Sequence, residues 1–179
     1  MLSALGVSDD NSSIMNKFET MGVQPRLPYY MSLLINVECL KNTVKHTVID
    51  EGATTSVMSL SCWEGLGSPK LSQSATMLTD FNGIYFRPHR ILTSLKVQLG
   101  GKTITIEVEV VDAPLNYNIL LGCNWMYSMQ AVASYLFRVA CFPFNGKIIM
   151  IDQTSFCNPS VSASSRASIP IITHHGGVT

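Results

Sequence analysis

The chain has 179 residues and a mass of 19.6 kDa, which suits one domain with flanking segments better than two domains. Apolar residues make up 46% of it and Asp, Glu, Lys and Arg only 13%, so the chain can build a core and has too little charge to be intrinsically disordered. Its 12 basic and 12 acidic residues cancel, which argues against a nucleic-acid partner or an anionic membrane surface.

Five cysteines are spread along the chain with no C-x-x-C pair: Cys39, Cys62, Cys123, Cys141 and Cys157. Their odd number and spacing favour reduced, mostly buried thiols over a disulfide or zinc framework. Residues 1–7 are apolar but lack the basic flank and length of a signal peptide, and no apolar run reaches the roughly 18 residues of a membrane-spanning helix. We therefore expect an intracellular, cytoplasmic protein with no metal, no cofactor and no membrane contact.

In chain order, residues 1–26 mix Ser, Asn, Asp and Met and end near two prolines, which predicts a flexible linker. Residues 27–157 should form the folded domain, and residues 158–179, rich in Ser, Pro and Gly, a second flexible linker. Short runs rich in Val, Ile, Leu, Tyr and Thr predict strands at 29–39, 44–50, 56–60, 75–81, 91–99, 103–111, 119–121, 133–142 and 147–152.

Two hairpins are the clearest local elements. Polar and apolar residues alternate on both sides of Gly100-Gly101, and glycines supply the positive φ angles that a tight hairpin turn demands. Asn145-Gly146 predicts a second hairpin for the same reason. Only residues 61–66 and 124–129 look helical. The pattern predicts an all-β barrel or sandwich with one or two short helices.

The first candidate for chemistry is Asp50. It follows a buried apolar strand and precedes Glu51, Gly52 and Ala53, so a carboxylate stands on a turn tight enough to need glycine. The alternative is an ordinary strand-ending turn in which Asp50 accepts a hydrogen bond from a nearby backbone N–H. Taken alone, the D-x-G pattern does not separate the two interpretations.

The second candidate is an apolar strand that ends in glycine, Ile119, Leu120, Leu121 and Gly122, and leads into the second short helix. By itself this pattern indicates only a strand buried in the core. An ordered set of motifs says more, and it consists of V-I-D-E-G-A at 48–53 with Ser56 and Met58, W-E-G-L-G-S-P at 63–69, L-G-G-K-T at 99–103, N-Y-N-I-L-L-G at 116–122, Ser134, L-F-R-V at 136–139, F-P at 142–143, Gly146, I-D-Q at 151–153 and S-F at 155–156.

In this order the motifs resemble the retropepsin-like protease domain of plant Gypsy-type LTR retrotransposon polyproteins, over about residues 29–156. The resemblance implies a closed retropepsin-like β-barrel and an aspartic endopeptidase that processes a polyprotein. Such hydrolysis needs two carboxylates that share one proton. This chain has one such motif, because neither Asp80 nor Asp112 is followed by a glycine at the right spacing. A working dyad therefore implies a homodimer that pairs two copies of Asp50.

The resemblance also implies a flap over an extended peptide substrate, at about residues 76–90. Its tip would be Asn82-Gly83, with Phe81 and Ile84 beside it, because a mobile turn tolerates positive φ there. For Phe81, ordinary packing on the sheet is an equally good interpretation. An active element would place the domain in a virus-like particle.

Four positions depart from the family pattern, and one of them is Arg90, beside the flap, where relatives tend to have Gly. Glu51 stands where retropepsins have Thr or Ser, so a dimer would bring two extra carboxylates near the dyad. Thr54 and Cys123 replace the two partners of a family ion pair, and losing both leaves no stranded charge.

These departures keep a second hypothesis open, a catalytically degenerate retropepsin-like domain used for dimerisation or peptide binding. A third, a small nucleic-acid-binding barrel, lacks a basic aromatic strand, and we interpret Lys96 and Lys102 as solvated edge residues.

Overall fold

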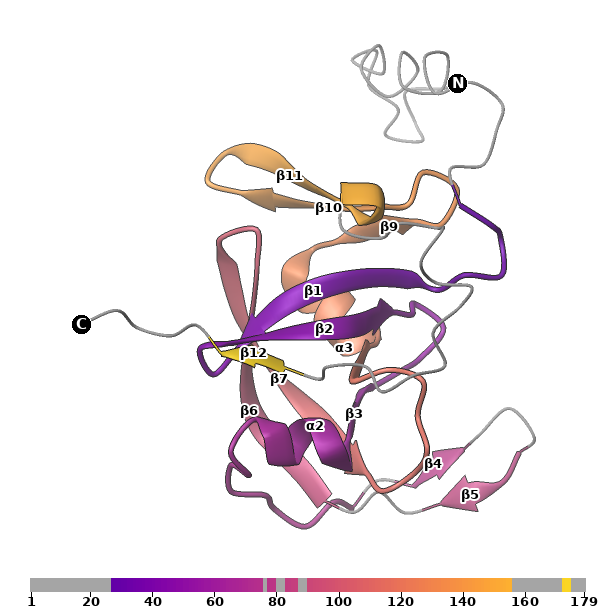
Figure 1. Ribbon diagram of the computed structural model, residues 1–179, viewed down its shortest axis with the longest axis vertical. Coiled ribbons are helices and arrows are strands. Elements are labelled where there is room, and N and C mark those ends of the chain that lie inside the picture. The colour runs from indigo at the N-terminus through magenta and orange to yellow at the C-terminus, as the bar shows by residue number, and fades with distance from the viewer. Residues whose placement is uncertain (1–26, 76, 80–82, 87–89, 156–171, 175–179) are drawn as a thin grey trace, which may run out of the picture.

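The computed structural model describes residues 27–75, 77–79, 83–86, 90–155 and 172–174 (Figure 1). Its elements, in chain order, are β1 (Leu33–Cys39), β2 (Asn42–Ile49), β3 (Ser56–Ser59), α2 (Leu60–Gly65), β4 (Leu78–Thr79), β5 (Tyr85–Phe86), β6 (Arg90–Leu99), β7 (Lys102–Val111), β8 (Ile119–Leu121), α3 (Cys123–Met129), β9 (Val132–Ser134), β10 (Val139–Phe144), β11 (Lys147–Asp152), the 3₁₀ turn η2 (Gln153–Ser155) and β12 (Ile172–His174).

The main sheet closes into a barrel. Its strand order is β1-β6-β7-β3-β8-β2-β12, and β1 also pairs with β2, so the strands from β1 to β2 form a ring. The pairings of β2 with β8 and of β3 with β7 are parallel, whereas the others in the ring are antiparallel. Closure leaves no open sheet edge around the ring, which is how a small all-β domain protects its strands from unwanted pairing.

Both predicted hairpins are confirmed. β6 and β7 are joined through Gly100 and Gly101, whose φ angles are +55° and +85°, and β10 and β11 through Asn145 and Gly146, at +51° and +71°. Positive φ at both turn residues is the geometry that matches the twist of the flanking strands. Lys102 is not the solvated residue that the sequence suggested, because its Nζ donates to the carbonyls of Met129 and Pro143. It thus joins this hairpin to the end of α3 and to β10.

Some predicted strand bounds were wrong. The first strand begins at Leu33 rather than at residue 29, because residues 28–31 form a turn in which Met31 N–H bonds to the Pro28 carbonyl. The strand predicted at 133–142 is two strands, β9 and β10, separated by a turn in which Arg138 has a φ of +57°. A strand was also predicted at 75–81, and among the described residues of this range only Leu78 and Thr79 form a strand, β4.

The C-terminal segment contributes one strand. Ile172–His174 forms β12 and pairs antiparallel with Asn42–Val44 of β2, beyond the stretch of β2 that β8 covers. The rest of residues 158–179, and residues 1–26, lie outside the described residues, so the linker boundaries stay a prediction.

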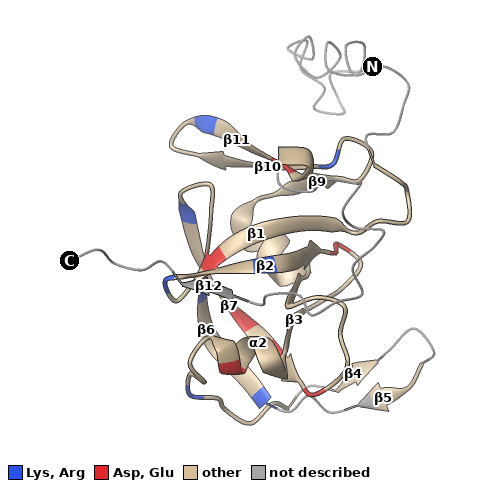
Figure 2. Ribbon diagram, viewed as in Figure 1, with Lys and Arg blue, Asp and Glu red and all other residues tan. Residues whose placement is uncertain are grey.

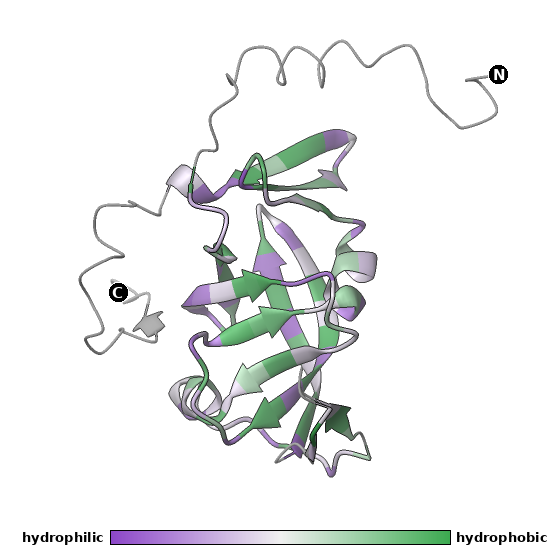
Figure 3. Ribbon diagram, turned by 90° about the vertical axis from the view of Figure 1, so that its right-hand side faces the viewer, coloured by the Kyte–Doolittle hydropathy of each residue, from purple (hydrophilic) through white to green (hydrophobic). Residues whose placement is uncertain are grey.

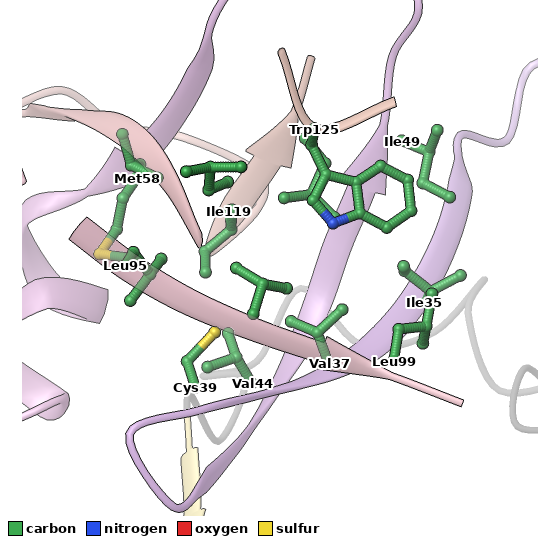
Figure 4. Close-up of a cluster of buried hydrophobic side chains, with 14 of the residues drawn as sticks. Ile35, Val37, Cys39, Val44, Ile49, Met58, Leu95, Leu99, Ile119 and Trp125 are labelled. Atoms are coloured by element: carbon green, nitrogen blue, oxygen red, sulfur yellow. The ribbon is translucent and has the colours of Figure 1, made fainter. Parts of the chain in front are cut away.

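The core fills the barrel and the space beneath α3 (Figure 4). Trp125 of α3 is fully buried beside Ile49, the last residue of β2. Cys39 and Cys62 are buried free thiols, and burial raises the pKa of each to about 12. They remain neutral at any physiological pH and pack as small apolar side chains.

The barrel lies between two smaller sheets. The three-stranded sheet β11-β10-β9 lies at one end of the molecule and the β4–β5 ribbon at the other, with α3 between the barrel and the larger of them (Figure 1). Charged residues are scattered singly over the elements, and β10 and β11 are largely hydrophobic (Figures 2 and 3). Within the described part of the chain, no helix is long and apolar enough to cross a membrane.

Candidate active site

Asp50 follows the C-terminal end of β2, where the strand leaves the barrel core. Its backbone N–H donates to the Leu121 carbonyl of β8 at 3.0 Å, and its carboxylate Oδ1 accepts the Gly52 N–H at 2.9 Å. Asp50 is half-buried, whereas Glu51 and Gly52 are exposed. The Asp50 turn, defined as residues 50–53, is therefore a tight loop closed on itself and tied to β8.

Gly122 packs directly against the backbone that follows Asp50. A Cβ built at Gly122 would lie 2.4 Å from the Thr55 carbonyl oxygen and 2.7 Å from the Ala53 carbonyl oxygen, far inside van der Waals contact. The adjacent Cys123 N–H donates to the Ala53 carbonyl at 2.7 Å. The apolar strand ends in glycine because only a residue without a side chain allows the two backbone segments to approach this closely.

A network of hydrogen bonds connects Gly122 to Ser56 of β3 and, through Asn124, to β7. The Ser56 hydroxyl accepts the Gly122 N–H at 3.1 Å and donates to Asn124 Oδ1 at 2.6 Å. Asn124 Nδ2 donates in turn to the Glu107 carbonyl of β7 at 2.9 Å. Ser56 was part of the recognised motif, but nothing in the sequence marked Asn124 as its partner. The network fixes the start of α3 against the strand that leaves the Asp50 turn.

Cys123, which the resemblance placed at a position usually held by arginine, forms a hydrogen bond within the chain. Its thiol donates to the Glu51 carbonyl at 3.0 Å, so it braces the backbone of the Asp50 turn without a charge. Thr54, the other half of the missing ion pair, is exposed.

A bulge bends β2 just before the site. The β1–β2 register changes from Ile35 opposite Thr47 to Val37 opposite Val44, which leaves one extra residue in β2, and His46 has a φ of +52°. Asn118 holds the bulge, since its N–H donates to the His46 carbonyl and its Nδ2 to the Lys45 carbonyl. Burial and neighbouring Lys45 lower the pKa of His46 below its usual value.

Two tyrosines lie close enough to Asp50 to be affected by its charge. Burial raises the pKa of Tyr117, and Asp50 raises it further. Burial also raises the pKa of Tyr135, with added contributions from Asp50 and Glu51 and a smaller, opposing one from Arg138. The Tyr135 hydroxyl donates to the Ile49 carbonyl at 2.6 Å. Sequence reasoning named neither tyrosine as a site residue.

The candidate flap residues are only partly described. Gly83 has a φ of +77°, the left-handed geometry expected of a flap turn, and Ile84 beside it is 61% exposed. Phe81 and Asn82 lie outside the described residues. Among the described residues, no group of three His, Cys, Asp or Glu side chains is placed to hold a metal ion.

The chain matches no protein-family model and no curated protein sequence. Its similarity is to solved structures. The retroviral protease-like domain of Ddi1 from Leishmania major superposes with a TM-score of 0.52 at 15% identity, covering 71% of this chain and 96% of that one. EIAV protease complexed with the inhibitor HBY-793 superposes with a TM-score of 0.50 at 18% identity, covering 59% of this chain and 94% of that one. The fold is retropepsin-like.

This fold confirms the predicted class, a mostly β protomer with a closed barrel and short helices. Within the retropepsin-like barrel, the structure brings together the two motifs that the sequence set 66 residues apart: Ser56 of the strand after Asp50 bonds Gly122. Of the motif residues, Ile119 and Leu121 are buried in the core, Leu120 is half-buried, and Gly122 lies under the Asp50 turn.

Proposed function

We propose that this chain is an aspartic endopeptidase of retroelement origin, of the plant Gypsy type, that processes a polyprotein as a homodimer. One observation carries the proposal. A retropepsin-like barrel presents Asp50 at the end of a buried strand, on a turn that Gly122 and Cys123 hold from beneath. An ordinary strand-ending turn does not need a second strand pressed against its backbone at distances that exclude a methyl group.

The chemistry requires two copies of Asp50 at a shared axis. One carboxylate, ionised, takes a proton from a water molecule, and the water oxygen attacks the carbonyl carbon of the peptide bond. The other, protonated, donates its proton to the carbonyl oxygen. Two like charges this close cannot both form, so the pair titrates as a unit and retains its one shared proton at mildly acidic pH. We therefore expect activity at about pH 5.

The sheet of β9, β10 and β11 is the surface that fits a second copy. Val132, Ile148 and Met150 are exposed apolar side chains on it, and β9 and β11 pair with β10 alone among the described strands. Exposed apolar side chains that share one sheet favour docking of a second copy. A homodimer formed here also supplies the carboxylate that a single chain lacks.

The substrate in this proposal is an extended peptide laid between the Asp50 pair and the β4–β5 ribbon. A peptide in strand form bonds through its backbone and is recognised by pockets for alternate side chains. Gly83 and Ile84, with Phe81 and Asn82, are the residues proposed to contact this peptide on the side away from Asp50. Closure of such a segment would exclude water from the scissile bond.

Glu51 favours a second candidate function. It is exposed on the Asp50 turn, and in a dimer its charge would add to that of the dyad. A degenerate domain that dimerises or binds peptides without cleaving them would tolerate this charge, whereas a protease must offset it.

Cleavage of an unstructured protein by the wild type and by Asp50→Asn, at about pH 5, separates the two candidates. Asn keeps the shape of Asp and removes the acid. Cleavage by the wild type and none by the variant supports the protease. A folded, dimeric wild type that cleaves nothing supports the binding module, and Glu51→Thr is then the variant that should restore activity.

A further inference from the structure

Tyr135 reaches the proposed catalytic turn from a distant part of the chain. It belongs to the turn between β9 and β10, and its hydroxyl donates to the carbonyl of Ile49, 86 residues earlier, at 2.6 Å. Ile49 is the last residue of β2, so this carbonyl belongs to the peptide unit that joins β2 to Asp50.

Both polar groups of that peptide unit are held. Its C=O accepts the Tyr135 hydroxyl, and its N–H, which is that of Asp50, donates to the Leu121 carbonyl at 3.0 Å. A peptide unit is planar, so fixing its two ends fixes the plane. The plane in turn fixes the position of the Asp50 Cα, the atom from which the side chain leaves the backbone.

The turn that delivers Tyr135 is itself firmly anchored. Arg138 is only 2% exposed and donates through its guanidinium to the carbonyls of Met31 and Pro28. Its own carbonyl accepts the Gln153 N–H at 2.9 Å, and its guanidinium lies 6.0 Å from the centre of the Tyr135 ring. Contacts to the segment before β1 and to η2 therefore hold this turn in one place.

We propose that Tyr135 is a positioning residue for Asp50: it holds the Ile49–Asp50 peptide unit so that the carboxylate points to the dimer axis. This inference rests on the proposed function. The phenol stays protonated, and therefore able to donate, at any pH where the enzyme works, because burial and the nearby negative charges raise its pKa.

The test compares Tyr135→Phe with Tyr127→Phe in the full chain. Tyr127 lies on α3, is 84% exposed, and serves as the matched control for loss of a phenol hydroxyl. With a peptide substrate, Tyr135→Phe should lower kcat by about two- to tenfold, the worth of one neutral hydrogen bond, and leave KM within about twofold. Tyr127→Phe should change neither. A loss confined to KM, or equal losses in the two variants, overturns the inference.

Amide hydrogen exchange gives a readout that needs no catalysis. Tyr135→Phe should speed exchange of the N–H groups of residues 50–53 at least about threefold over the wild type, with β6 and β7 unchanged. Unchanged exchange in the Asp50 turn, or a uniform rise across the barrel, contradicts positioning. A wild type that cleaves nothing overturns the proposed function, and the exchange result then decides the inference on its own.

Discussion

Gly122→Ala should be among the most damaging single-methyl changes in the described part of the chain. The new Cβ would lie 2.4 Å from the Thr55 carbonyl oxygen and 2.7 Å from that of Ala53, and backbone atoms cannot rotate away. Overpacking of this kind costs about 3 kcal/mol, the upper end of its usual range. Hydrogen bonds from Gly122 to Ser56 and from Cys123 to Ala53 weaken with it and add about 1 kcal/mol.

The total of about 4 kcal/mol corresponds to a fall in Tm of about 10 °C for a chain of this size. Urea unfolding followed by the fluorescence of Trp63 and Trp125 measures this loss of stability, with the m-value as a check on two-state behaviour. Gly146→Ala is the matched control, because no atom lies within 4 Å of its Cβ and its φ of +71° costs only about 1 kcal/mol. Equal losses in the two variants would refute the close-approach argument.

Two further changes test the surroundings of Asp50. Ser56→Ala should cost about 1–3 kcal/mol in urea unfolding, because it leaves the buried Gly122 N–H without its hydroxyl acceptor; a loss below about 0.5 kcal/mol would show that Asn124 or water replaces it. His46 has a folded pKa below its unfolded value of 6.5, so its contribution to stability is full above pH 6.5 and is lost as pH falls from there toward the folded pKa. His46→Asn, which tolerates the φ of +52°, should therefore lose less stability than the wild type between pH 8 and pH 5, and equal losses would contradict the assignment.

The parts of the fold that the sequence predicted correctly depend on local signals. Gly100-Gly101 and Asn145-Gly146 can adopt positive φ at both turn positions, so the hairpins follow from neighbouring residues alone. Asp50 was named from the D-x-G pattern of its turn, and Gly122 only from the ordered set of motifs that resembles the retropepsin-like family. The split between β9 and β10 was missed, since Arg138 carries no glycine-like mark of its left-handed turn.

The supporting contacts of the site depend on distances along the chain that no local pattern reveals. Tyr135 and Asn124 look like ordinary residues of a strand and a helix until folding brings them to Ile49 and Ser56. The bulge at His46 is likewise invisible, because a polar residue there fits an unbroken strand equally well. The hydrogen-bond partners of these residues can be identified only once the barrel has closed.

The central claim, that two chains share one active site, is tested most directly by mixing. Wild-type chain at fixed, dimer-saturating concentration is re-equilibrated with increasing amounts of Asp50→Asn, and cleavage of a peptide is followed at about pH 5. If each site needs Asp50 from both chains, random pairing reduces activity in proportion to the wild-type fraction, to about one half at equal amounts and one tenth at ninefold excess. Activity that stays constant through the titration would contradict the shared site.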